Sequence, residues 1–185
     1  MATLNVKNKK ATKPMDVKVI QSEGLAKMVR ENALQKTSEQ VSRFDKGKDL
    51  ETLFQQFDFT ERFKYNLAVE AAQVLAEADE NVLSVYQFGE SMNPAIAGGD
   101  CVPVDPCTHL LCLVDSPSAA LQAFIDALDR AVTDELTSLP TPCFANLTSA
   151  LDISLITKED VAARKGLAAL LSSVHAPPLA VWRRI

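Results

Sequence analysis

The feature that most constrains this fold is a change in the spacing of apolar residues after Asn81. Before that residue, apolar side chains recur every three or four positions between Phe63 and Leu75, which places them on one face of a helix. After it, short apolar runs rich in β-forming residues occur at 82–88, 109–114 and 151–156. The chain therefore predicts helices first and a sheet second.

The remaining patterns complete the predicted order of elements. We expect helices at about 22–45, 50–57, 58–78, 117–136 and 157–174, a final edge strand at 179–182 and a possible strand at 143–147. Asp115 or Ser116 is the predicted N-cap of the fourth helix, and Thr157 that of the fifth. This order predicts an α/β (α+β) fold in which helices flank a small mixed sheet.

The length of 185 residues favours one domain, and the charge is unevenly distributed along it. Residues 1–18 carry five lysines and one acid, a charge of +4, so the rest of the chain carries −9. We therefore expect a flexible, disordered basic arm at 1–21 and a domain at 22–185. That domain divides into a helical lead-in at 22–79 and a sheet-containing core at 80–185. The acidic body argues against a broad nucleic-acid surface.

Several features favour the cytosol as the compartment. There is no apolar run long enough for a transmembrane helix and no apolar segment typical of a secretory signal at the amino end. In such a chain we expect the four cysteines to be thiols or metal ligands rather than disulfides. Cys112, inside an apolar run, is predicted to be a buried inert thiol.

The order of elements from the helix at 58–78 to the run at 151–156 resembles nucleotidyltransferases of the polymerase-β type. In those proteins a strand ending in Phe-Gly-Ser precedes a strand with an Asp-x-Asp pair, and a later strand carries a third acid. Here 82–89 (VLSVYQFG) is similar to the first strand, and Asp152 stands where the third acid is expected. The resemblance implies two Mg²⁺ ions and a nucleotide phosphate beside Gly89 and Ser91.

The acid pair that this resemblance requires is missing. Alignment on the apolar strand places Cys107 and His109 at the two aspartate positions, and no Asp-x-Asp occurs in 90–114. The first hypothesis is therefore a non-catalytic interaction, assembly or regulatory module without a cofactor. It contacts another protein through the basic arm or the 90–108 loop, and its oligomeric state is left open. A divergent Mg²⁺-dependent enzyme would instead have to use Asp100, Asp105 and Asp152.

A cluster of soft ligands gives a third hypothesis. Cys101, Cys107 and His109 lie within nine residues and could bind Zn²⁺, with Asp100, Asp105 or Cys143 as a fourth ligand. Their spacing matches no standard zinc motif. A nucleophilic pair of Cys101 or Cys107 with His109 or His175 is a further alternative, although no flanking signature supports it.

Overall fold

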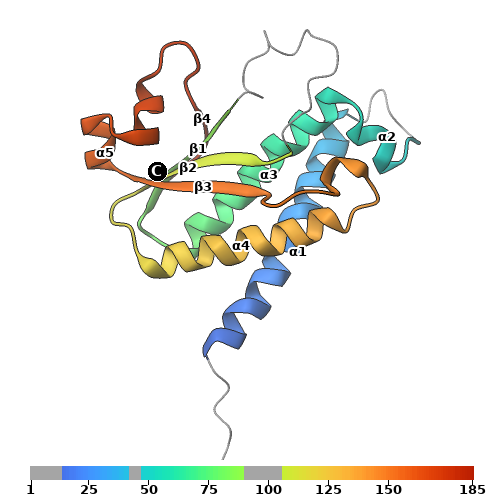
Figure 1. Ribbon diagram of the computed structural model, residues 1–185, viewed down its shortest axis with the longest axis horizontal. Helices are drawn as coiled ribbons and strands as arrows, with labels where there is room; N and C mark the ends of the chain where they lie inside the picture. Colours follow the sequence, from blue (N-terminus) through green and yellow to red (C-terminus); the bar gives the residue numbers. More distant parts are fainter. Residues whose placement is uncertain (1–13, 42–46, 90–105) are drawn as a thin grey trace, which may run out of the picture.

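Two long helices, α3 (Phe57–Ala78) and α4 (Ala119–Thr137), cover one face of a four-stranded sheet, and a third, α1 (Pro14–Val41), packs against both of them (Figure 1). Two short helical segments lie against the other face. The computed structural model describes the backbone of residues 14–41, 47–89 and 106–185, and within the first range the side chains of 23–40 only. A short helix, α2 (Leu50–Phe54), precedes α3. The α/β fold class is confirmed.

The sheet contains both antiparallel and parallel pairs. Its strands are β1 (Val82–Phe88), β2 (Thr108–Val114), β3 (Leu151–Thr157) and β4 (Leu179–Arg183), in the spatial order β3-β2-β1-β4. β1 is antiparallel to β2 and β4, whereas β2 and β3 are parallel and are joined by α4. Consequently the end of β1 meets the beginnings of β2 and β3 at one edge of the sheet.

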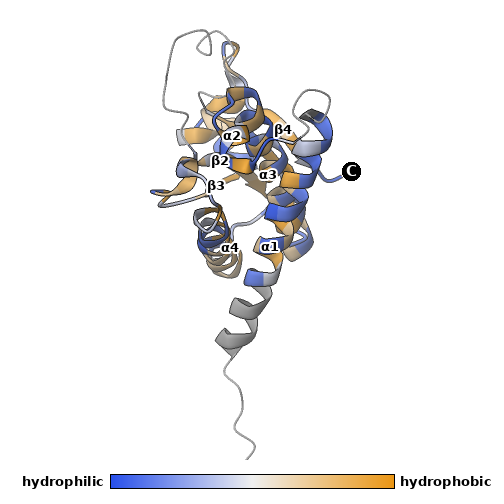
Figure 2. Ribbon diagram, turned by 90° about the vertical axis from the view of Figure 1, so that its right-hand side faces the viewer, coloured by the Kyte–Doolittle hydropathy of each residue, from blue (hydrophilic) through white to orange (hydrophobic). Residues whose placement is uncertain are grey.

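The main core lies between the sheet and the long helices. It includes Phe63 and Leu67 of α3, Leu128 of α4, and Leu110 and Cys112 of β2, all fully buried. Phe54, Phe63 and Phe144 pack edge to face or tilted at centroid distances of 5.0–5.9 Å. Figure 2 shows hydrophobic and hydrophilic residues alternating along α1 and α4, as expected for helices with one buried side.

Polar contacts attach α1 to its neighbours. The Glu70 carboxylate of α3 is buried and accepts hydrogen bonds from Asn32, at 2.9 Å, and from Lys36. Asn66 of α3 donates to Thr37 Oγ1 at 2.9 Å. The side of α1 that carries Ala26, Val29 and Ala33 therefore joins the core through small residues, with polar bonds beside it.

The second face of the sheet has a smaller apolar cluster. Leu111, Ile156 and Ala168 are buried there, under α5 (Lys158–Ala163) and the 3₁₀ segment η3 (Gly166–Ser172). Thr157 caps α5 with a capping box, as predicted. The helix expected to continue through Val174 ends at Ala163 instead, because Arg164 and Gly166 have positive φ values of 51° and 54°.

Other predicted details were wrong for local reasons. α1 begins at Pro14 rather than near residue 22, consistent with proline at a first helical position. The N-cap of α4 is Ser118, whose hydroxyl accepts from the Leu121 amide at 3.0 Å. The possible strand at 143–147 begins instead with the 3₁₀ turn η2 (Pro142–Phe144). Leu167 and Val174, apolar residues of the helix expected at 157–174, are 43% and 86% exposed.

Candidate functional site

The candidate site lies where β1 ends and β2 and β3 begin, on the face opposite the long helices. Successive strand residues point to opposite faces, so His109 shares its side of β2 with Leu111, whereas Thr108 and Leu110 face the helices. His109 is the register partner of Phe88 on β1 and of Asp152 on β3. Three neighbouring strands therefore bring these side chains together.

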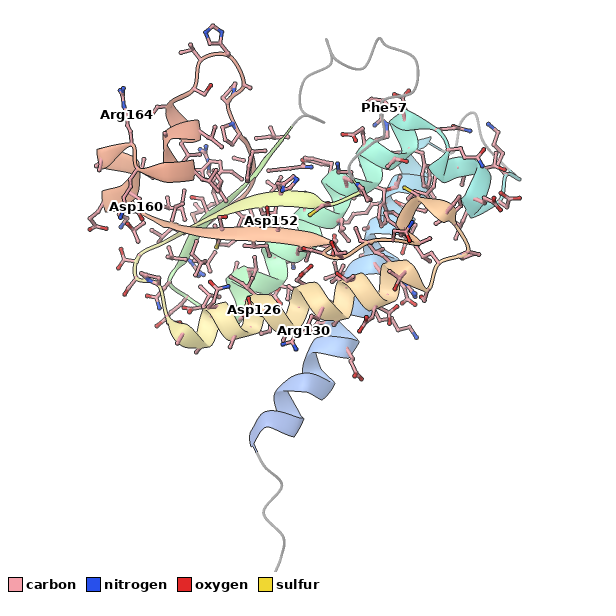
Figure 3. All side chains as sticks on the ribbon, in the orientation of Figure 1. Phe57, Asp126, Arg130, Asp152, Asp160 and Arg164 are labelled. Atoms are coloured by element: carbon pink, nitrogen blue, oxygen red, sulfur yellow. The ribbon has the colours of Figure 1, made fainter. Side chains whose placement is uncertain are left out.

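A hydrogen bond between His109 and Asp152 is the central contact of this site. His109 Nδ1 lies 2.9 Å from Asp152 Oδ2, and the two side chains are 30% and 56% exposed. An ionised carboxylate can only accept, so Nδ1 carries the proton and, in the neutral ring, Nε2 carries the lone pair. In Figure 3 Asp152 stands on β3, at the opposite end of the strand from Asp160 and Arg164.

Phe88 and Gly89 form the wall beside the imidazole. The rings of Phe88 and His109 are 5.6 Å apart between centroids, with an interplanar angle of 45°. Gly89 has a φ of 122°, and a Cβ atom there would meet His109 Cδ2 at 3.4 Å. The backbone conformation and the close imidazole therefore account for the glycine without a bound phosphate.

Two buried polar groups at this end of the sheet were not predicted. Gln87 and Thr108 face the long helices and are 2% and 0% exposed. Gln87 Oε1 and Thr108 Oγ1 have no hydrogen-bond partner in the part of the chain that the structure describes. Their burial is visible only in the fold, because one polar residue within or beside an apolar strand gives no distinctive pattern in the sequence.

The residues predicted to bind metal or nucleotide are only partly within the described residues. Ser91, Asp100, Cys101 and Asp105 fall in 90–105, outside them. Within 23–40, 47–89 and 106–185, no group of three His, Cys, Asp or Glu side chains is arranged to hold a metal ion. Cys107, His109 and Asp152 therefore do not form a three-ligand site by themselves.

Cys143, the other possible fourth ligand, belongs to the opposite side of the sheet from the cluster next to His109. It packs against the main core, on the side of the long helices, and burial raises the pKa of its thiol, an effect that Lys64 partly offsets. Cys112 is a free, fully buried thiol on the same side, as predicted, and burial raises its pKa to about 12.

Comparisons of the chain with family models, with curated proteins and with solved structures gave no match. Across the described helices, none combines the length and the apolar character needed to cross a membrane.

Proposed function

We propose that this protein is a non-catalytic, nucleotidyltransferase-like module that binds another protein for assembly or regulation. The observation that carries the proposal is the His109–Asp152 hydrogen bond at the positions where such an enzyme needs carboxylates. The binding surface is the end of the sheet around this pair, together with the lysine-rich amino-terminal segment. We place the protein in the cytosol, where thiols such as Cys112 and Cys143 stay reduced.

The donor set around His109 does not suit magnesium. Mg²⁺ prefers oxygen ligands in octahedral geometry, whereas an imidazole nitrogen suits Zn²⁺, Cu²⁺ and similar metals. Here β2 offers an imidazole in place of the second carboxylate of the Asp-x-Asp pair. The remaining acid, Asp152, already accepts a hydrogen bond from that imidazole. These residues fit a recognition surface better than a magnesium clamp.

Titration with nucleotides tests this proposal directly. The intact chain is titrated by calorimetry with each of the four ribonucleoside triphosphates and Mg²⁺, and thermal shift is recorded in parallel. We expect no saturable heat up to millimolar nucleotide and no change in melting temperature. Saturable binding at micromolar nucleotide, or incorporation of a labelled nucleotide, contradicts the proposal.

A variant that rebuilds the acid pair tests the resemblance separately. Cys107→Asp with His109→Asp puts carboxylates at both positions aligned with Asp-x-Asp, beside Asp152. If the fold is nucleotidyltransferase-like, the double variant gains Mg²⁺-dependent nucleotide binding. Cys107→Asn with His109→Asn is the matched control, because it has a similar shape without the charges. Equal behaviour of the two double variants counts against the resemblance.

A second candidate function is binding of a transition metal through His109. A carboxylate that accepts from Nδ1 is the usual outer partner of a metal-bound histidine, because it orients Nε2 toward the ion. This candidate predicts stoichiometric zinc in the purified intact chain by elemental analysis, lost in His109→Ala but retained in His175→Ala. Purified protein without stoichiometric metal, also after incubation with Zn²⁺, excludes it.

A further inference from the structure

A groove between three helices lies at the other end of the sheet from His109 and on the opposite face. Its volume is about 400 Å³, and it is bounded by the amino-terminal half of α1, the end of α3 and the start of α4. Its apolar lining consists of Leu25, Val74, Leu121 and Phe124, with Ala78 and Ala120 at its sides. The groove is therefore apolar and offers a place for one or two aliphatic side chains.

The rim of the groove is acidic. Glu77 and Asp79 both line it, and Glu80 follows directly in the chain. Glu77 accepts a hydrogen bond from Gln73, and Asp79 accepts two from Asn81, so both carboxylates bond to neutral groups. The nearby Arg184 guanidinium donates to the backbone carbonyls of Ala76 and Asp79. A segment that combines aliphatic and cationic side chains matches this groove.

Residues 1–13 of the same chain have this composition. They contain four lysines and no acid, and Leu4 and Val6 are separated by one residue, which places both on one side of an extended segment. We propose that this segment turns back at the start of α1 and docks in the groove, with Leu4 and Val6 inserted and Lys7 beside the acidic rim.

The lengths agree with this arrangement. Eleven residues of α1 separate Pro14 from Leu25, which corresponds to about 17 Å along the helix axis. An extended chain covers that distance in about five residues, so after a turn of about three residues the returning segment reaches Leu25 near position 5. The tether also gives the segment an effective concentration of about a millimolar, which favours docking within one molecule.

The consequence is a built-in competitor for the lysine-rich segment. A partner that binds this segment has to release it from the groove, and release uncovers Leu25 and Phe124, the two half-buried residues of the apolar lining. The competition rests on the proposed function, which gives the same segment to a partner, whereas the docking itself does not. The groove and the His109 site lie on opposite faces and at opposite ends of the sheet, so a failure at one leaves the other intact.

Nuclear magnetic resonance of the intact chain tests the docking. We compare amide and methyl spectra of the wild type with those of a Leu4→Ser, Val6→Ser double variant. The expected result is a set of shift changes confined to the groove, at Leu25, Val74 and Leu121. An Ala2→Ser, Ala11→Ser double variant is the matched control, because it alters the same segment and leaves the two inserted side chains in place.

A charge exchange makes the test specific for the rim. Glu77→Lys is expected to reproduce the shift changes of the apolar double variant, and adding Lys7→Glu to it is expected to reverse them. Glu159→Lys, at an exposed position on α5, is the control for a general charge effect. Superimposable groove signals in wild type and in the Leu4→Ser, Val6→Ser variant overturn the proposal. Groove signals that change with protein concentration also overturn it, because they indicate docking of a second copy.

Discussion

The two faces of the sheet are covered very differently. The first face packs against α3 and α4, which α1 covers in turn, and this side includes most of the buried apolar residues. The second face has a small cluster around Leu111, Ile156 and Ala168. The His109–Asp152 pair lies on this second face, with side chains 30% and 56% exposed. Most of the buried apolar packing therefore lies on one face, and the partly exposed pair on the other can carry binding at little cost to the fold.

Two adjacent leucines on β2 allow the largest test of this difference. Leu110 and Leu111 are both fully buried, but the first faces the long helices and the second faces η3. We expect Leu110→Ala to lower the free energy of unfolding by about 4 kcal/mol, within the usual range for a rigid core. Leu111→Ala is expected to cost about 2.5 kcal/mol, because a thinner layer can close around the cavity. Urea denaturation measures both losses, provided that the dependence of the unfolding free energy on urea concentration is the same as in the wild type. If the two variants lose equal stability, or Leu111→Ala loses more, the two faces do not differ as described.

Asp129 connects α4 to the beginning of β3, and it gives the next largest effect. Its Oδ1 atom accepts from the amides of Ala150 and Leu151, at 2.9 and 2.8 Å, and from the Ser149 hydroxyl at 3.2 Å. Removing the carboxylate in Asp129→Ala takes this acceptor from the partly buried Leu151 amide, whereas the Ala150 amide keeps Thr133 Oγ1 at 2.9 Å. The expected loss is about 2 kcal/mol.

The matched variant for Asp129 is Asp129→Asn, which keeps one acceptor oxygen and is expected to cost about half as much. Asp134→Ala, at an exposed position on the same helix, should change stability by less than about 0.5 kcal/mol. If Asp129→Ala behaves like Asp134→Ala in urea denaturation, the start of β3 is held by strand pairing alone.

Cys112 gives a pH-dependent test of the helix-covered face. Burial raises its pKa from 9.0 to about 12, so the unfolded chain loses the thiol proton at lower pH than the folded chain. The contribution of this thiol to stability is therefore complete below pH 9 and declines as pH rises toward 12, by up to about 1.4 kcal/mol per pH unit. Cys112→Ala is expected to remove this part of the decline between pH 9 and 10.5, measured by urea denaturation. If the free energy of unfolding declines equally with pH in wild type and Cys112→Ala, other groups cause the decline.

The sequence predicted the strands well because their composition reflects their surroundings. β2 is buried on both faces, so it reads as a continuous apolar run, and its predicted and observed bounds differ by one residue at the start. Cap positions were harder, since Asp115, Ser116 and Ser118 are all suitable N-caps and the choice depends on where α4 meets the sheet. The prediction of a single helix at 157–174 was wrong because the helical spacing of leucines continues in the sequence past the turn at Arg164.

The candidate site was predictable only in part. The resemblance placed His109 and Asp152 near each other, but their hydrogen bond depends on the parallel register of β2 and β3, which no local pattern contains. The role of Arg184 was also hidden, because its guanidinium donates to the Val82 carbonyl more than a hundred residues away. Contacts of this kind follow from the assembled sheet and not from neighbouring residues.

The smallest expected effect concerns the His109–Asp152 pair, and it separates binding from stability. An exposed ion pair or hydrogen bond contributes about 0–1 kcal/mol, so Asp152→Ala, His109→Ala and the double variant should each cost less than about 1 kcal/mol in urea denaturation. The coupling energy from this double-mutant cycle should be equally small. If either single variant lowers the free energy of unfolding by more than about 2 kcal/mol, the pair serves to stabilise the fold. That result would also remove the main reason for treating the surface around this pair as a binding surface, because a surface kept for recognition can be altered without unfolding the protein.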